Sequence, residues 1–154
     1  DADVQVSVSL VRPDDTEWFI TSGLLRLSDR AVADTSTALR IDRTYRAEDS
    51  EPMPADEFEP AKVALPSFAQ AFRPGDRLLV SISSPGRNFG AWTFSTRGED
   101  EAPRDVAWGG AQASRLVVGV LAGVSVPDAE PWPCPSLRGQ ACRPYEPVTN
   151  VDAP

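Results

Sequence analysis

Residues 72–84 read FRPGDRLLVSISS, and this stretch places a tight turn directly before an alternating strand. Pro74 holds φ at about −65° and Gly75 accepts a positive φ, which are the two requirements of a type II turn. Leu78, Val80 and Ile82 then fall on one side of the chain. This period of two predicts a half-buried β-strand.

Three further runs have the same strand character. Residues 4–11, VQVSVSLV, alternate between apolar and polar as far as Leu10. Residues 17–27 continue after a Pro-Asp turn at 12–15, which predicts a hairpin, and Gly23 is the expected position of a bulge. Residues 114–121, SRLVVGVL, are the last strong run of strand character.

The part of the chain between the hairpin and the turn is less regular. Residues 28–60 are polar, acidic and contain proline, so we expect an irregular crossing there. Residues 62–65 predict a short strand, and residues 67–72 could form one helical turn. No segment of about ten or more residues has the period of a helix.

These runs, separated by proline and glycine, predict an all-β protein. Only about five to seven strands are visible, whereas a jelly roll needs about eight. We therefore expect a jelly-roll, galactose-binding-like β-sandwich that is incomplete without sequence preceding Asp1. Its expected core consists of the apolar side chains of the alternating runs: Val4, Val6, Val8, Leu10, Leu78, Val80, Ile82, Leu116, Val118 and Val120.

The composition excludes several classes of function. The net charge of the 154-residue chain is −8, with 15 basic and 23 acidic residues, which argues against nucleic acid or an anionic membrane as partner. The longest apolar candidate, residues 116–126, is shorter than the roughly 18 residues of a membrane span. There is no histidine, so the usual general base of serine and cysteine hydrolases is missing.

Two cysteines, Cys134 and Cys142, lie in the proline-rich stretch PWPCPSLRGQACRPY. Two ligands are too few for a structural zinc site, so we interpret the cysteines as a local disulfide in an exported, secreted or cell-envelope protein. The alternative is a pair of free thiols in a cytosolic tail. We expect residues 1–126 to form the main part of the sandwich and residues 127–154 a C-terminal tail.

Motifs for catalysis or cofactor binding are absent from the sequence. It contains no G-x-S-x-G elbow and no glycine-rich phosphate loop, so no cofactor is expected. The acidic runs at 49–51 and 99–101 are typical of solvated loops. The spacing of Asp1 with Asp3 and of Asp14 with Asp15 fits no calcium motif, so no metal site is predicted.

Three motifs, in order, resemble a known family. The first is an aspartate-rich start, a Pro-Asp turn and a Gly-x-Leu-Arg strand, carried by Asp1, Asp3, Pro13, Asp14, Gly23, Leu25, Arg26 and Arg30. The second is the corner FRPGDRLLVSISS, and the third is Ser114, Arg115 and the aliphatic run 116–118. Over roughly residues 1–126 the chain resembles the C-terminal domain of the X-Pro dipeptidyl-peptidase, cocaine esterase and α-amino-acid ester hydrolase family. The family usually has histidine in the corner where this chain has Asp76.

This resemblance implies a parent serine hydrolase that acts on ester or amide bonds. The family combines an α/β-hydrolase body carrying a Ser-Asp-His triad with a helical cap and this β-sandwich. The triad would lie upstream, so no catalytic residue is assigned here. The sandwich would pack on the hydrolase body and help to shape its active-site cleft. We select Arg26 and Arg30 as candidates for contacts between the domains.

A second hypothesis is a carbohydrate-binding β-sandwich module. Trp92, Phe94 and Trp108 lie in a glycine-rich stretch, where exposed rings could stack on sugars. The alternative for these rings is packing against other parts of the parent protein. Retention on polysaccharide, lost in Trp92→Ala, would favour the binding module.

Overall fold

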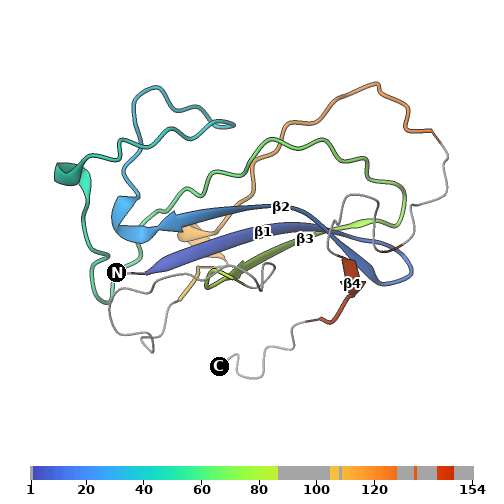
Figure 1. The fold of residues 1–154 in the computed structure, drawn as a ribbon, viewed down its shortest axis with the longest axis horizontal. Coiled ribbons are helices and arrows are strands. Elements are labelled where there is room, and N and C mark those ends of the chain that lie inside the picture. Colours follow the sequence, from blue (N-terminus) through green and yellow to red (C-terminus); the bar gives the residue numbers. More distant parts are fainter. Residues whose placement is uncertain (1, 87–104, 108, 128–133, 135–141, 148–154) are drawn as a thin grey trace.

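The computed structural model describes residues 2–86, 105–107, 109–127, 134 and 142–147. Its centre is one antiparallel sheet of four strands in the order β3-β1-β2-β4 (Figure 1). The strands are β1 (Asp3–Val11), β2 (Thr16–Arg26), β3 (Arg77–Ser83) and β4 (Cys142–Pro144). Within the described ranges the chain forms no α-helix. The all-β prediction is confirmed at this level, whereas the sandwich is not observed in these residues.

The predicted hairpin is present as β1 and β2. Its turn closes through hydrogen bonds from the Arg12 amide to the Thr16 carbonyl and from the Asp15 amide to the Arg12 carbonyl, both 3.0 Å long. Asp15 takes a positive φ of 58°, a conformation that Asp tolerates better than most residues. The Asp14 carboxylate accepts the Thr16 amide at 3.0 Å, as in an Asx turn.

A bulge interrupts this hairpin, but not at Gly23. Val8 pairs with Thr21 and Ser9 with Phe19, so the extra residue on β2 is Ile20. Gly23 has a different role, because a Cβ there would lie 2.0 Å from the carbonyl oxygen of Ala64. Glycine at this position lets the chain around residue 64 cross directly over β2.

The turn before β3 is formed as predicted. Gly75 has a φ of 90°, and the Asp76 amide donates to the Arg73 carbonyl at 3.0 Å. The register pairs Val6 with Ile82, Val8 with Val80 and Leu10 with Leu78, so the alternating residues of β1 and β3 share one face. We call this the apolar face of the sheet; its members on β2 include Leu25 and Trp18, opposite Val4 and Leu10.

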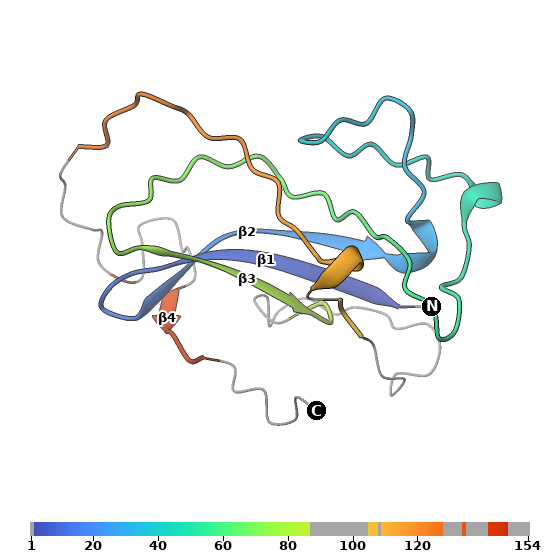
Figure 2. The same cartoon turned by 180° about the vertical axis from the view of Figure 1, so that it is seen from behind.

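The connection from β2 to β3 is irregular, as expected. It contains two 3₁₀ turns, η1 (Leu27–Asp29) and η2 (Ala47–Asp49), and one isolated bridge between Val32 and Arg43. The predicted short strand at 62–65 and the helical turn at 67–72 are absent. Instead, residues 52–73 follow an extended path along the sheet, as the green trace shows in both views (Figures 1 and 2).

The prediction of a strand at 114–121 is wrong. After a third 3₁₀ turn, η3 (Gly110–Gln112), residues 113–121 are assigned to no strand. Among the described residues, 115–126 make no backbone-to-backbone hydrogen bond. A pattern of apolar residues is not sufficient for a strand, which also needs a hydrogen-bonded neighbour.

The core is smaller than predicted and differently placed. The buried apolar side chains are Val8, Leu10, Val11, Trp18 and Leu25. Of the predicted core, Val4, Val6 and Leu116 are half-buried, and the exposed ones are Leu78, Val80, Ile82, Val118 and Val120. The apolar face loses cover toward β3 because only extended chain, and no second sheet, lies over it among the described residues.

Replacing Val8 by Asp tests the position of the core. Val8 is 0% exposed at the centre of β1. A carboxylate there would be buried without a partner, so Val8→Asp should cost about 3–5 kcal/mol of unfolding free energy and abolish the fold. Val120→Asp is the matched control, since Val120 is 82% exposed, and it should change stability by less than about 0.5 kcal/mol. Urea unfolding followed by circular dichroism measures both, and equal midpoints would mean that the core is misplaced.

Gly23→Ala tests the close crossing at Ala64. The added methyl group forces apart two backbone segments, so we expect a loss of about 1–3 kcal/mol. Gly109→Ala is the control, because Gly109 has a φ of −146° and no atom within 4 Å of a Cβ. If the two variants unfold at the same urea concentration, residue 64 does not cross β2 at this point.

Asp14 gives the fold a predictable response to acid. Its hydrogen bonds from the Thr16 amide, then from the Thr16 hydroxyl, hold the pKa of the carboxyl below its usual value of 3.8. A depressed pKa contributes stability above the unfolded value, and this contribution is lost as the pH falls through the folded value. NMR titration should therefore show Asp14 ionised at a pH where a free aspartate is protonated. Asp14→Asn should flatten the loss of stability below about pH 4.

Candidate functional site

The side of the sheet opposite the apolar face carries a row of buried polar groups. Gln5, Ser7 and Ser9 on β1 are all buried there. The Gln5 amide donates to the Ser7 hydroxyl at 3.1 Å, and its oxygen accepts the Gly86 backbone amide at 2.9 Å. Hydrogen bonding of this kind offsets the cost of removing polar groups from water. The sequence showed this face only as polar and therefore suggested that it was solvated.

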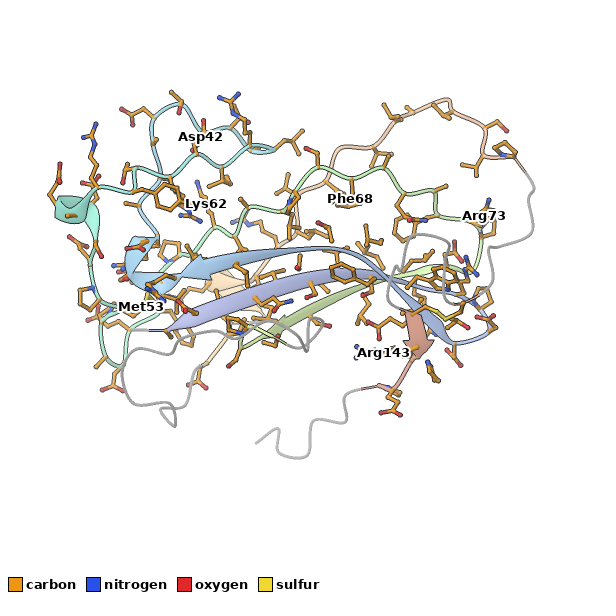
Figure 3. The ribbon with its side chains drawn as sticks, in the orientation of Figure 1. Asp42, Met53, Lys62, Phe68, Arg73 and Arg143 are labelled. Atoms are coloured by element: carbon orange, nitrogen blue, oxygen red, sulfur yellow. A yellow bond between two sulfur atoms is a disulfide. The ribbon has the colours of Figure 1, made fainter. Side chains whose placement is uncertain are left out.

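The strongest polar contact of this face joins β2 to β4. The Glu17 carboxylate accepts Arg143 Nε at 2.8 Å on Oε2 and Arg143 Nη2 at 3.1 Å on Oε1. The Ser9 hydroxyl donates to the same Oε1 at 2.9 Å. The Glu17 side chain is 8% exposed, and its hydrogen bond raises the pKa of Arg143. A buried carboxylate requires such a partner, so Glu17 and Arg143 act as a unit (Figure 3 labels Arg143).

Cys134 and Cys142 form a disulfide, as predicted. Their Cα atoms are 5.9 Å apart, inside the usual range for such a bond. Cys142 is also the first residue of β4, so the disulfide is attached directly to the strand that carries Arg143. The described part of the tail thus joins the sheet, while the division at residue 126 stays a prediction.

The two arginines selected for contacts between domains have partners within the chain. Arg26 binds both carboxylate oxygens of Asp3, Nε to Oδ1 at 2.8 Å and Nη2 to Oδ2 at 2.9 Å, which raises the pKa of Arg26. Arg30 donates to the Leu27 and Glu51 carbonyls and lies 3.6 Å from the Glu51 carboxylate. Both therefore fix the end of β2 to its surroundings, and their part in contacts between domains stays a prediction.

The predicted surface aromatics Trp92, Phe94 and Trp108 lie outside the described residues. The acidic pairs of the sequence have other partners: Asp3 binds Arg26, and Asp15 forms an ion pair with Arg77. In the described part of the chain no group of three Cys, Asp or Glu residues could hold a metal ion. The same part contains no helix of the length and apolarity that a membrane crossing requires.

Two groups of exposed apolar side chains bear on the function. One is the outer part of the apolar face on β3, at Leu78, Val80 and Ile82. The other, which we call the exposed apolar segment, is residues 117–126, with exposed Val117, Val118, Val120, Leu121, Val124 and Val126. A soluble monomer rarely leaves so many aliphatic groups together in water, and such patches mark interaction surfaces. The segment is the orange trace in Figure 2, and it lies on the same side of the sheet as residues 52–73.

Sequence reasoning missed Glu17 and Arg143. Glu17 was assigned to a strand, but nothing in its neighbourhood distinguishes a buried carboxylate from a solvated one. Arg143 is 126 residues away in a proline-rich stretch, where no periodicity predicts a strand. The one available signal was the adjacent Cys142, because a disulfide restricts the conformation of the residues next to it.

Comparison with known proteins places most of the chain in a family. Residues 1–117 match the X-Pro dipeptidyl-peptidase C-terminal non-catalytic domain. Searches of curated proteins and of solved structures return no match. The match covers most of the chain, including β1, β2, β3 and the start of the exposed apolar segment. The chain therefore belongs to the family of X-Pro dipeptidyl-peptidase C-terminal non-catalytic domains.

Proposed function

We propose that this chain is the C-terminal accessory segment of an exported serine hydrolase that cleaves ester or amide bonds. Membership of the family implies association with the catalytic domain of a parent peptidase. In this proposal the chain packs on an α/β-hydrolase body and helps to form one side of its active-site cleft. The family match supports the non-catalytic role, and the disulfide supports export, since such bonds persist in oxidising compartments.

The observation that carries the proposal is the exposed apolar segment. Burying one of its valine or leucine side chains contributes roughly 1.5–3 kcal/mol, so several together can hold two domains in contact. Within the described part of the chain, the backbone groups of residues 115–126 pair with no other backbone group, which adds hydrogen-bonding capacity to the same surface.

The proposal includes a fold: in the parent protein this sheet would form part of a jelly-roll sandwich. A second sheet, contributed by other parts of the parent protein, would cover Leu78, Val80 and Ile82. Their exposure is what one expects of a sheet whose apolar face is only partly covered.

Surface variants test the docking. Val120 and Leu121 are 82% and 85% exposed, so Val120→Asp with Leu121→Asp should leave folding intact. The double variant should weaken binding to the parent's catalytic domain at least about tenfold, because two charges replace apolar contact. Isothermal titration calorimetry measures the change.

Tyr45→Asp is the matched control for this experiment. Tyr45 is 80% exposed and belongs to the irregular connection between β2 and β3, not to residues 117–126, so its replacement should leave the affinity unchanged. Equal affinity of the wild type and the double variant would contradict the proposal. So would labelling of the isolated chain by a fluorophosphonate serine probe, since a non-catalytic segment should not react.

A further inference from the structure

The outer edge of β2 is covered by a short piece of the C-terminal region. β1 pairs with one edge of β2, and on the other edge Thr16, Glu17 and Trp18 pair with Pro144, Arg143 and Cys142. The Tyr145 amide then donates to the Asp15 carbonyl at 2.7 Å, which continues the contact past the strand. An uncovered edge presents free backbone donors and acceptors with which any other strand could pair. The pairing of β4 with residues 16–18 prevents this at that part of the edge.

Arg143, the side chain at the centre of this contact, is bound specifically by Glu17. Arg143 meets Glu17 through two parallel N–H to oxygen bonds, a geometry that the single ammonium group of lysine cannot reproduce. Glu17 is oriented for this contact by the Ser9 hydroxyl at 2.9 Å. The carboxylate is thus buried and held in place by β1, while the arginine comes from a separate part of the chain.

A third contact involves Tyr145, the residue two positions after Arg143. The Arg77 guanidinium lies over the Tyr145 ring, 5.0 Å from its centroid, within the range of a cation–π interaction. Arg77 is itself fixed by its ion pair with Asp15 at the end of the hairpin. The β1–β2 turn and the start of β3 therefore build one side of this contact, and residues 142–145 fill it.

From these contacts we infer that the edge of β2 at residues 16–18, with Glu17 and Arg77, is a peptide-binding site. It accepts an extended segment by strand addition and selects arginine followed, two residues later, by an aromatic ring. Its occupant in this chain is the chain's own segment 142–145, which closes the sheet edge. Covalent attachment gives this segment a high effective concentration, so it excludes competing peptides. This inference is independent of the proposed docking on a hydrolase body.

Hydrogen exchange in the full chain tests the occupancy. Arg143→Gln should speed exchange of the Tyr145 amide at least tenfold while leaving the Val8 amide protected. Arg143→Lys keeps the charge but should show most of the same loss, because it cannot form both bonds. Unchanged Tyr145 exchange in both variants would overturn the inference, as would equal loss of protection at Val8 and Tyr145.

Peptide binding in trans tests the selectivity. Fluorescence anisotropy measures binding of a labelled hexapeptide of residues 142–147 that carries Cys142→Ser. This peptide should bind the Arg143→Gln chain, and it should bind the wild-type chain at least tenfold more weakly. The same peptide with lysine in place of arginine should bind at least tenfold more weakly. In a chain carrying both Glu17→Gln and Arg143→Gln, which leaves no unpaired charge, the arginine and lysine peptides should bind equally. Equal binding of the two peptides to the Arg143→Gln chain would overturn the selectivity, and binding to no chain would overturn the site.

Discussion

The pairing of β1 with two neighbours is the constraint on which the rest of the structure depends. β1 is hydrogen-bonded to β2 on one side and to β3 on the other, which places it at the centre of the sheet. Val8 is fully buried on one face of this strand, and Gln5, Ser7 and Ser9 are buried on the other. A central strand with two covered faces must satisfy its polar groups internally, and this requirement brings Gly86, Glu17 and, through Glu17, Arg143 into the structure.

Local sequence was sufficient for the parts of the fold that depend on local rules. A period of two identified β1 and β3, and the Pro-Asp and Pro-Gly turns identified the turn of the hairpin and the corner at Gly75. The same rules failed at residues 114–121, because alternation describes which side chains could face a core and says nothing about whether a neighbouring strand exists. They also misjudged Gly23, whose absent side chain is explained by Ala64, a contact between residues distant in sequence.

The polar contacts also show that local sequence does not predict contacts between distant residues. The Cys134–Cys142 pairing was predictable, since only two cysteines exist and they lie close together in the chain. The pairing of Glu17 with Arg143 was not, because both residues belong to the types normally found on the surface. The intrachain partners of Arg26 and Arg30, Asp3 and Glu51, were not predicted from the sequence either. The proposed contacts of these two arginines with another domain stay a prediction.

The β2 edge and the exposed apolar segment differ in how far the chain's own residues cover them. The β2 edge is covered at residues 16–18 by backbone pairing, by the ion pair of Arg143 with the buried Glu17 carboxylate and by a cation–π contact, and a disulfide is attached to the covering strand β4. The exposed apolar segment has no comparable cover among the described residues, although its aliphatic groups gain more from burial than a polar edge does. The chain thus pairs part of its β2 edge, at residues 16–18, with its own residues, while the exposed apolar segment stays open among the described residues. In the proposed docking, this open segment rather than the β2 edge would face the catalytic domain of the parent.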